Sequence, residues 1–450
     1  MRQPAPQTPP VALTVAGSDS GGGAGIQADL KTMEACGAFG TSAVTSVTAQ
    51  NTVGVEGTHL LPTSEIAAQV DAVLEDFDVG AVKTGMLATA EVVELVTEYA
   101  PDLPNLVVDP VMVAASGDRL LEPEAEAAYE DLVAQARLVT PNADEAGVLT
   151  GVQPTDEREA EEAAEQLVAM GADAALVKGG HLGGDTVTDV LVTGDRVETF
   201  RHERVEGAAT HGSGCALSAA IAARLAQGES LDVAVAAGVD LLARAVRYPL
   251  DVGEGPGSVH HLVETRERAA RGEALDAVEG IVERFVDRDV GALVPEVGMN
   301  VVGATPYAEV PEEVAAVEGR ITRTRSGVKP NRGVRAGASS HVARFLLACR
   351  EFDPDLRFAV NCRFDDQVEA ALDALDGGVA AYERSEEPEA VKAREGATQQ
   401  WGARRAFERA DDTPVAVVDR GEVGKEAIVK LLASDADALV ERTFTLLDAL

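Results

Sequence analysis

Short apolar runs alternate with amphipathic segments through the first half of the chain. The apolar runs are rich in valine, leucine and alanine, each ends in a polar or glycine-bearing segment, and they cover residues 11–16, 80–83, 106–109 and 174–178. Between them, apolar residues recur at helical spacing over residues 26–36, 64–76, 90–100, 124–136 and 156–170. This alternation predicts an α/β domain with a mostly parallel sheet covered by helices on both faces. Ligands of such domains bind at the carboxyl ends of the strands.

The pattern changes after residue 261. Apolar residues at helical spacing, among them Val278, Ile281 and Phe285, predict a charged linker helix over residues 266–290 that packs on a second domain. Beyond it, residues 358–363 and 415–421 predict strands that end in polar groups. We therefore expect a first domain over residues 1–265 and a second domain over residues 291–450.

The length and the charge of the chain fit this division. At 450 residues the chain is too long for one ordinary core. It carries 76 Asp and Glu residues against 38 Lys and Arg residues, which gives a formal net charge of -38. The acids are spread over the whole chain, so self-repulsion should destabilise the compact state unless salt screens it. We expect a salt-rich setting and no nucleic-acid partner.

The sequence shows no membrane or disulfide signature. No apolar run approaches the length of a membrane span, and residues 1–10 are polar and Pro-rich, without an apolar signal-peptide core. We expect a cytoplasmic protein with no membrane partner. The four cysteines have no C-x-x-C spacing, so neither a zinc cage nor a disulfide framework is indicated.

The stretch from residue 210 to residue 220 carries the sharpest chemical signal. Gly212, Ser213 and Gly214 precede an alanine-rich run of good helix formers. Such a turn directs backbone N–H groups into one concavity, and the helix adds the positive end of its dipole, so a phosphate fits the site. Cys215 sits at the first turn, where we expect its thiolate form to be favoured. The alternative is a helix start that merely needs small residues.

Polar residues follow each apolar run and are suited to phosphoryl transfer. Lys178 can supply a cation and the turn of Gly212 to Gly214 a cradle, while Asp109 and Glu145 can hold Mg²⁺ or its waters. Asn142 precedes Glu145 in the same segment. Each carboxylate alone could equally be a helix cap or a solvated residue.

These segments resemble a known family. Residues 16–19, 22–31, 49–52, 83–87, 178–181 and 210–215 look like the bifunctional hydroxymethylpyrimidine/phosphomethylpyrimidine kinase of thiamine synthesis, a member of the ribokinase-like superfamily, in order and spacing. The resemblance implies a three-layer α/β/α fold, ATP as substrate, and nucleotide contacts from Asn142, Lys178 and residues 212–214. It implies that Gln50 pairs with the aminopyrimidine edge, that Gly17, Asp29, Met86 and Val113 line the pocket, and that Cys215 is the base.

Two departures and one alternative accompany this resemblance. The family usually has Ser where this chain has Gly21 and Thr where it has Ser213, and the Gly21 change removes one possible phosphate donor. Relatives that act on pyridoxal typically carry Asp where Cys215 stands, so the cysteine favours a pyrimidine substrate. A kinase for pyridoxal or another hydroxymethyl heterocycle is the alternative.

The second domain contains a basic run without acids. Residues 319–350 hold seven arginines and one lysine but no Asp or Glu, and their glycines and prolines lead into Ser339, Ser340, His341 and an apolar helix. This pattern predicts a further anion site at a helix start, with arginines suited to bidentate phosphate contacts. A solvated basic face or a nucleic-acid arm is the alternative.

Residues 317–320, 337–344 and 419–425 are similar to the archaeal-type thiamine-phosphate synthase domain. The resemblance covers residues 278–450 and implies a three-layer α/β/α domain with a mixed sheet, which joins the pyrimidine diphosphate to thiazole phosphate and releases pyrophosphate. It implies catalytic roles for Arg320 and His341. It also implies a set of substrate-binding residues: Ser339, Ser340, Asn361, Arg363, Asp419 and Lys425.

The two resemblances together predict a fused enzyme of thiamine synthesis that uses ATP and Mg²⁺. Its expected partners are small-molecule substrates, and we expect a homo-oligomer. The alternative for the second domain is a sensor that binds thiamine phosphate without catalysis, since related domains are attached to DNA-binding regulators. No helix-turn-helix pattern is present in the sequence, and both Arg320 and His341 are, which favours the enzyme.

Overall fold

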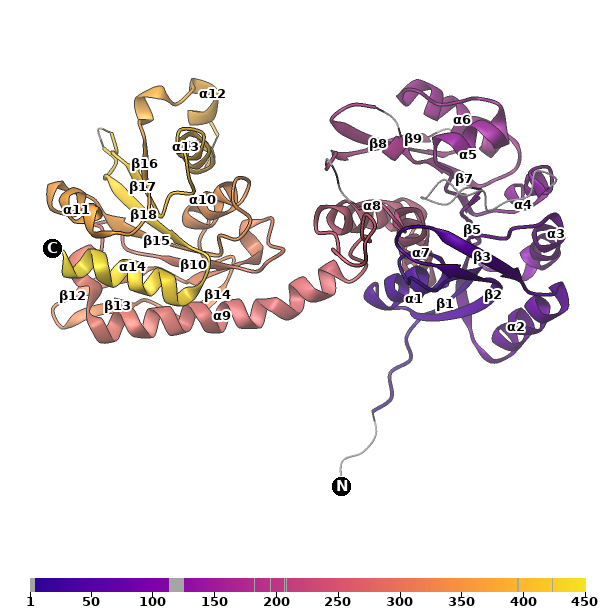
Figure 1. Ribbon diagram of the computed structural model, residues 1–450, viewed down its shortest axis with the longest axis horizontal. Helices are drawn as coiled ribbons and strands as arrows, with labels where there is room; N and C mark the ends of the chain where they lie inside the picture. Colours follow the sequence, from indigo (N-terminus) through magenta and orange to yellow (C-terminus); the bar gives the residue numbers. More distant parts are fainter. Residues whose placement is uncertain are drawn as a thin grey trace. The chain divides into compact units, whose positions relative to one another are not determined.

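The computed structural model describes residues 5–112, 125–181, 183–194, 196–205, 207, 209–394, 396–422 and 424–450. The chain divides into two compact units, residues 1–264 and 265–450. Each unit consists of one main sheet between two layers of helices (Figure 1). This architecture confirms the predicted α/β/α fold class.

The sheet of the first unit has the order β3-β2-β1-β4-β5-β6-β7-β8-β9 over its described strands. Pairings from β2 to β7 are parallel, and β3, β8 and β9 add antiparallel edges. The strands are β1 Val11–Asp19, β2 Phe39–Gln50, β3 Val55–Leu60, β4 Val79–Thr84, β5 Val107–Val108, β6 Leu138–Val139, β7 Ala174–Val177, β8 Thr186–Thr193 and β9 Arg196–Glu203.

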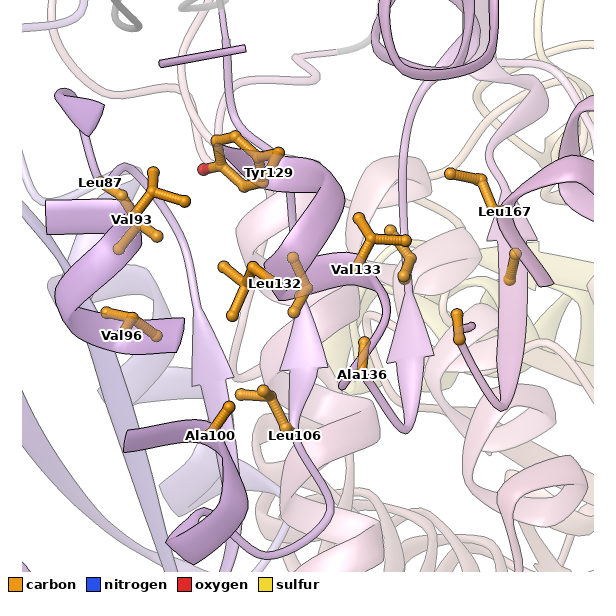
Figure 2. Packing of buried hydrophobic residues seen from close by; sticks show 14 of the residues in the cluster. Leu87, Val93, Val96, Ala100, Leu106, Tyr129, Leu132, Val133, Ala136 and Leu167 are labelled. Atoms are coloured by element: carbon orange, nitrogen blue, oxygen red, sulfur yellow. The ribbon is translucent and has the colours of Figure 1, made fainter. Parts of the chain in front are cut away.

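Two layers of helices cover this sheet because successive strand residues point to opposite faces. Leu13 and Val15 pack under one layer, whereas Ala12 packs under the other. The first layer contains α2 Thr63–Asp76, α3 Ala90–Tyr99, α4 Tyr129–Val133, α5 Ala143–Thr150 and α6 Glu157–Ala169, and the second contains α1 Gly25–Ala35, α7 Ser213–Ala226 and α8 Leu231–Arg247. Figure 2 shows part of the first core, where Val93 and Val96 of α3 face Leu132 of α4.

The sheet of the second unit has the order β14-β11-β10-β15-β18-β17-β16. Among the described strands of this second sheet, only β16 and β17 pair in parallel and the other pairings are antiparallel. The sheet is therefore mixed, as predicted. The strands are β10 Val301–Ala304, β11 Val314–Val317, β14 Val334–Ala336, β15 Phe358–Arg363, β16 Val379–Tyr382, β17 Ala416–Asp419 and β18 Ile428–Ala433; β12 Ile321–Thr324 and β13 Gly327–Pro330 form a separate hairpin.

Helices again lie on both faces. The first face packs against α9 Val263–Arg288, α11 Asp366–Ala371 and α14 Ala436–Asp448, and the second against α10 His341–Cys349 and α13 Ala397–Phe407, with the short α12 Glu389–Lys392 nearby in sequence. The expected linker helix corresponds to α9, whose Val278, Ile281 and Phe285 belong to the core of the second unit. Within that unit Glu267 accepts a hydrogen bond from Thr305 Oγ1.

The structure differs from the expected elements in places. The apolar pattern does not predict β2, β3, β8 or β9. In β2 the reason is that Thr41, Thr45 and Thr48 occupy buried positions, so the strand lacks a continuous apolar run. The helix expected over residues 124–136 is limited to α4 in its described part. No described helix is both long enough and apolar enough to cross a membrane.

Candidate active sites

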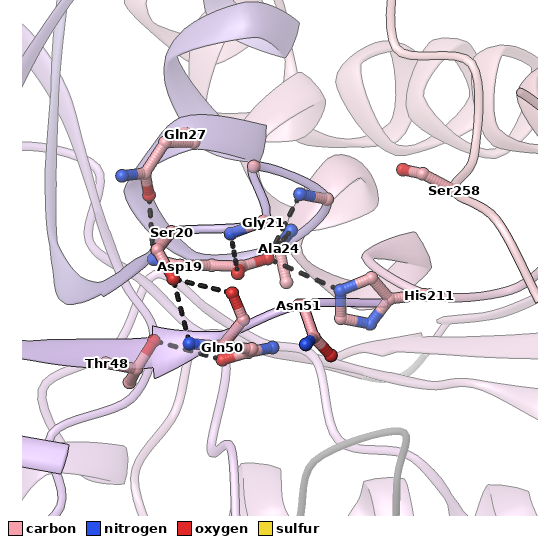
Figure 3. Close-up of polar contacts among 12 residues, drawn as sticks. Asp19, Ser20, Gly21, Ala24, Gln27, Thr48, Gln50, Asn51, His211 and Ser258 are labelled. Atoms are coloured by element: carbon pink, nitrogen blue, oxygen red, sulfur yellow. Dashed lines mark hydrogen bonds and ion pairs between the residues drawn. The ribbon is translucent and has the colours of Figure 1, made fainter. Parts of the chain in front are cut away.

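The loop after β1 is folded around the carboxylate of Asp19 (Figure 3). Asp19 Oδ1 accepts a hydrogen bond from the backbone N–H of Gly21 at 2.8 Å, and Oδ2 accepts from Gly23 and Ala24 at 3.0 and 2.8 Å. The backbone N–H of Asp19 in turn donates to Gln27 Oε1 at 2.8 Å. The buried carboxylate is therefore the internal anchor of the glycine-rich loop.

His211 connects this loop to the turn before α7. Its Nε2 lies 3.3 Å from Asp19 Oδ2, and Figure 3 shows the ring beside the carboxylate. The backbones of the two turns are also in close contact at Gly212 and Gly23. Gly212 has φ +82°, and a Cβ at this position would lie 1.8 Å from the carbonyl oxygen of Gly23, so only glycine fits there. Burial raises the pKa of Asp19, but hydrogen bonds from His211 and the loop N–H groups outweigh it, and the pKa ends below its usual value.

Helix α7 begins beside a buried ion pair. A Cβ at Gly214 would lie 3.2 Å from Lys178 Nζ and 3.6 Å from Asp109 Oδ2, so the first turn of the helix is in contact with both residues. The N-cap residue Gly212 contributes no side chain to the helix end. The positive end of the helix dipole and the Lys178 ammonium therefore lie next to each other, and together they favour the binding of a phosphate.

Lys178 is held by two carboxylates. Its Nζ lies 3.0 Å from Asp109 Oδ1 and 3.9 Å from Glu145 Oε2. Asp109 follows β5, Lys178 follows β7, and Glu145 lies in the first turn of α5, so the parallel strands bring the three together at their carboxyl ends. Asp109 Oδ2 also accepts from Ser218 Oγ of α7 at 3.2 Å. The structure thus joins the predicted cation, carboxylates and helix start in one cluster.

Glu145 has a second, capping role. Asn142 Oδ1 accepts from the backbone N–H of Glu145 at 2.9 Å, and the backbone N–H of Asn142 donates to Glu145 Oε2 at 2.8 Å. Burial raises the pKa of Glu145, Lys178 opposes this effect and Asp109 adds to it, with the result that the pKa is about 7. This carboxyl group therefore titrates near neutral pH.

A second buried pair lies near Cys215. Lys83 Nζ of β4 is 2.9 Å from both oxygens of Asp29, and Thr14 Oγ1 donates to Asp29 Oδ2 at 2.6 Å; Asp29 and Lys83 are fully buried. The expectation that the helix start favours the Cys215 thiolate is wrong for the free protein. Burial raises the pKa of the Cys215 thiol to about 11, although the nearby Lys83 lowers it. Desolvation of the thiolate outweighs the helix start.

The remaining residues of the predicted pyrimidine pocket lie on β1, β2 and the loop after β4. A Cβ at Gly17 would lie 2.8 Å from Ser46 Oγ and 3.3 Å from Met86 Sδ. Gln50 ends β2, and its Oε1 accepts from Thr48 Oγ1 at 3.2 Å (Figure 3). Sequence reasoning missed Ser46, whose buried hydroxyl has no hydrogen-bond partner within the described part of the chain. The predicted pocket residue Val113 lies outside the described residues.

In the second unit, Arg320 lies in the turn between β11 and β12. It has φ +71°, which is uncommon for a residue with a side chain. Its Nη1 donates to the carbonyl oxygen of Val297, and Asn361 Nδ2 donates to the carbonyl oxygen of Gly298 at 3.1 Å. Asn361 Oδ1 also accepts from Asn300 N at 2.7 Å. The buried Asn361 therefore orders the loop on which Arg320 rests and is not directed at solvent.

His341 is the first residue of α10, directly after Ser340, and Ser339 is buried. Ser340 Oγ lies 3.3 Å from His341 Nδ1. Just beyond the other end of α10, Arg350 Nη1 donates to Ala308 O at 2.9 Å, next to the carboxyl end of β10. The start of α10 therefore lies toward the opposite end of the sheet, where β15 and β17 end. Arg350 is thus tied to the fold, and the sequence does not show this role.

Asp419 ends β17 inside a buried network. Arg384 donates to both of its oxygens, at 2.9 Å from Nε and 2.7 Å from Nη2, and Tyr382 Oη donates to Oδ2 at 2.7 Å. The N–H of Gly421 donates to Oδ1 at 3.0 Å, so Asp419 fixes the turn that follows. Sequence reasoning missed Arg384 and Tyr382, because nothing local to them marks a long-range partner.

Arg363 and Lys425 lie at the same end of the sheet as Asp419. Arg363 is the last residue of β15, donates from Nε to the carbonyl oxygen of Ala292 and forms an ion pair with Asp365. The exposed Lys425 lies 3.7 Å from Glu422 Oε1. Of the residues expected to bind substrate here, Asn361 and Asp419 therefore support loops, while Lys425 reaches solvent.

Two protein families match this chain, one over each of its two units. Residues 19–260 match the phosphomethylpyrimidine kinase family, and residues 277–444 match the family described as thiamine-phosphate synthase ThiN. The chain belongs to the phosphomethylpyrimidine kinase family. It also carries the thiamine-phosphate synthase domain, so it is an enzyme of thiamine biosynthesis with two domains, as the sequence predicted.

Two relatives illustrate the match to this family. The hydroxymethylpyrimidine/phosphomethylpyrimidine kinase of Streptomyces coelicolor is 49% identical over 259 residues, which are 57% of this chain and 96% of that protein. The thiamine biosynthesis bifunctional protein ThiED of Geobacter sulfurreducens is 46% identical over 261 residues, 57% of this chain and 53% of that protein.

Solved structures agree on the fold. The pyridoxal kinase of Staphylococcus aureus in complex with AMP-PCP and pyridoxal has a TM-score of 0.54 and 30% identity, over 58% of this chain and 96% of that chain. An ADP complex of Bacillus subtilis pyridoxal kinase has a TM-score of 0.53 and 34% identity, over 56% and 98%. These likenesses confirm the predicted ribokinase-like first domain.

The kinase domain also has a hollow that sequence reasoning missed. It has a volume of about 770 Å³ and lies between the start of β8 and the end of β9. Its lining includes Thr186, Arg201, His202 and Arg204, and Arg204 Nη1 donates to Gly180 O at 2.8 Å, two residues after Lys178. One residue of its lining, Arg204, therefore contacts the segment that follows Lys178.

Proposed function

We propose that the first domain transfers the γ-phosphoryl group of ATP to 4-amino-5-hydroxymethyl-2-methylpyrimidine and then to its monophosphate. We propose that the second domain joins the resulting diphosphate to thiazole phosphate, giving thiamine phosphate and pyrophosphate. The observation that carries the kinase assignment is the cluster of Lys178, Asp109 and Glu145 at the start of α7. The buried Asp29 and the half-buried Cys215 lie close by, as a pyrimidine with a reacting hydroxyl requires.

In the kinase reaction, the substrate hydroxyl oxygen forms a bond to the γ-phosphorus while the bond to the ADP oxygen breaks. The hydroxyl proton passes to Cys215 as base, and the Lys178 ammonium and the α7 N-terminus neutralise charge on the phosphoryl oxygens. Gln50 pairs with the aminopyrimidine edge, and Gly17, Asp29 and Met86 line the pocket, as does Val113 by the family resemblance. Asn142 and residues 212–214 contact the nucleotide, and the hollow near Arg204 has room for its remaining part.

The residues present fit a Mg²⁺ ion. Such an ion takes one or two carboxylates together with phosphate oxygens and water, and Asp109 and Glu145 are two carboxylates within one cluster. When bound, Mg²⁺ neutralises phosphate charge. No group of three or more acidic, His or Cys side chains forms a metal site among the described residues, so we propose an ion that depends on the nucleotide for its other ligands.

In the second domain, the thiazole nitrogen forms a bond to the pyrimidine methylene carbon while the carbon–oxygen bond to the diphosphate breaks. Arg320 and His341 stabilise the negative charge that builds on the departing diphosphate. Ser339 and Ser340 at the start of α10, Arg363 and Lys425 complete the substrate site, with Asn361 and Asp419 as positioning residues behind them.

One experiment tests the whole proposal. Pure protein incubated with hydroxymethylpyrimidine, thiazole phosphate and MgATP should form thiamine phosphate. Formation of the pyrimidine diphosphate alone would support the alternative in which the second domain only senses thiamine phosphate. The similar kinase of Staphylococcus aureus was solved in complex with pyridoxal, so pyridoxal is the second substrate to assay, and faster turnover of pyridoxal would replace the pyrimidine assignment.

We further propose a homo-oligomer. The supporting observation is that three apolar side chains of β2, β3 and the loop between them are exposed: Val47, Val53 and Leu60, at 49%, 66% and 41%. A monomeric mass in light scattering would contradict it.

A further inference from the structure

Lys430 is a buried cation that the sequence analysis did not single out. It lies in β18, only 3% exposed, between Asn361 of β15 and Val417 of β17 in the sheet register. Its neighbour along the strand, Val429, packs under α9 and α14, so the side chain of Lys430 projects from the opposite face, the face that carries α10 and α13.

The ammonium group of Lys430 lies against aromatic rings without an oxygen partner. Its Nζ is 4.6 Å from the ring centroid of Phe345 and 5.8 Å from that of Tyr382. No hydrogen-bond acceptor for Nζ occurs within the described ranges of the chain, and both oxygens of Asp419 accept from other donors. The ammonium group keeps a small exposed area, through which a ligand can supply the acceptors that the protein does not.

Lys430 lies directly behind the proposed coupling site. Phe345 is one helical turn after His341 on the same face of α10, and its ring contacts Lys430. The next register positions toward the end of the sheet hold Arg363 and Asp419, both paired with Ile428. Lys430 therefore lies two residues along β18 from Ile428, the partner of Arg363 and Asp419, and its long side chain starts just behind these two site residues.

We propose that Lys430 binds the phosphate of the thiazole substrate and of the thiamine-phosphate product. This inference rests on the proposed coupling function. The reaction brings two anionic substrates together, and Arg320 with His341 serves the leaving diphosphate. The other phosphate also needs a cation. Arg363 is paired with Asp365 and Lys425 lies near Glu422, whereas the three N–H donors of Lys430 are free of oxygen partners among the described residues.

The charges around Lys430 make this binding proton-linked. Burial lowers the pKa of Lys430, Asp419 raises it and Arg384 lowers it, so that the pKa is about 8. The titratable and charged groups that face Lys430 or its partners come from β16, β17, α10 and the loops after the strands: Tyr382, Asp419, Cys349, Arg384, Glu387 and Glu422. A bound phosphate favours the ammonium, so binding near pH 8 should take up protons.

The test compares thiamine phosphate with thiamine on the full chain by calorimetry in buffers of different ionisation enthalpy. At pH 8 the phosphate monoester is already a dianion, so proton uptake reports on the protein. Lys430→Met should lower the affinity for thiamine phosphate about 10- to 100-fold, as expected for a lost charged hydrogen bond, and leave the affinity for thiamine unchanged. It should also abolish the proton uptake.

Two further variants keep the test decisive. Lys430→Arg retains a charge that does not titrate at pH 8, so the preference for thiamine phosphate should persist without proton uptake. Lys392→Met, at an exposed lysine paired with Glu389, is the matched control and should change neither quantity. Thermal melting of each variant separates loss of binding from loss of the fold.

The outcomes separate this inference from the proposed function. If Lys430→Met keeps the full preference for thiamine phosphate while the wild-type chain couples its substrates, the inference fails and the function stands. If the preference depends on Lys430 but the wild-type chain makes no thiamine phosphate, the inference stands and the domain is a sensor. Absence of any wild-type preference for thiamine phosphate overturns the inference.

Discussion

His211 Nε2 lies 3.3 Å from Asp19 Oδ2, and this contact joins the two glycine-rich turns of the kinase domain. One turn follows β1 and the other begins α7, almost two hundred residues later in the chain. Because Asp19 also accepts hydrogen bonds from three backbone N–H groups of its own loop, the position of the loop after β1 depends on the position of the turn before α7.

Replacing Asp19 should therefore loosen both turns. Asp19→Asn loses the charge and one acceptor, so we expect kcat/KM of the kinase to fall about 10- to 100-fold and the free energy of unfolding to fall by about 1–3 kcal/mol. The pKa of Asp19 is lowered in the folded state, so its stabilisation is present above the unfolded pKa and is lost as pH falls through the folded pKa.

Kinetics and urea unfolding as a function of pH measure these effects. Asp173→Asn, at an exposed pair with Arg137, is the control and should change neither quantity. An Asp19→Asn enzyme with wild-type kinetics would show that the contact does not position the site.

Cys215→Ala should lower pyrimidine phosphorylation by about 10²- to 10⁴-fold, as for a lost acid–base group, and leave ATP binding intact. Since burial raises the pKa of Cys215 to about 11, only a small fraction is thiolate at pH 7, and the wild-type rate should rise with pH from 7 to 9. The Cys36→Ala control should keep both the rate and its pH dependence. Near-normal turnover of Cys215→Ala would remove this residue from the mechanism.

Glu145 should make metal binding and stability depend on pH near neutrality. Its folded pKa of about 7 lies above the unfolded value of 4.5, so without metal the stability falls as pH rises from 4.5 to 7. Mg²⁺ needs the ionised carboxylate, so Mg²⁺·ATP binding should strengthen over the same change and release a proton. Glu145→Gln should flatten both trends in melting curves and titration calorimetry. A wild-type Tm that rises from pH 5.5 to pH 7.5 as steeply as that of the variant would contradict the assignment.

Arg320→Ala and His341→Ala should lower coupling turnover more than substrate binding, because both side chains act on charge that develops in the transition state. Neither change should affect the kinase. Preformed pyrimidine diphosphate in the assay keeps the first domain out of the measurement. Arg325 is an exposed arginine in the neighbouring hairpin, and Arg325→Ala is the control. If all three variants couple normally, the sensor alternative becomes the better one.

The net charge of -38 predicts that thermal stability and activity rise in molar KCl, because screening relieves self-repulsion. Tm measured at increasing KCl, with sucrose of matched osmolality as the control, tests the salt effect directly. A Tm that stays flat or falls across the series would contradict a salt-adapted protein.

Local sequence signals predicted the parts of the site that are built locally. The turn at Gly212, the run that ends at Lys178 and the capping segment at Asn142 each combine a strand or helix end with its own polar residues, and parallel topology then brings them together. Arg384 and Lys430 could not be predicted in the same way. Their environment depends on which strands pair and in which register, and that pairing spans residues far apart in the chain.

The protonation state of Cys215 and the role of Asn361 also could not be predicted from the sequence. A helix start alone predicts a stabilised Cys215 thiolate, but the depth of burial decides the pKa, and burial is a property of the assembled core. The same holds for Asn361, which an isolated strand end presents as a ligand contact but which the structure uses to hold the loop under Arg320.

The packing of α9 and α14 on one core has a consequence for synthesis. Val278 and Phe285 of α9 share a cluster with Leu439 and Leu446 of α14, which follows much later in the sequence. The kinase sheet and its helices are complete in sequence before α9 emerges from the ribosome, and domains generally fold as units during synthesis. The apolar stripe of α9 must instead wait for α14, so a chain that stalls before residue 436 would expose this stripe to chaperones and proteases after the kinase domain has folded.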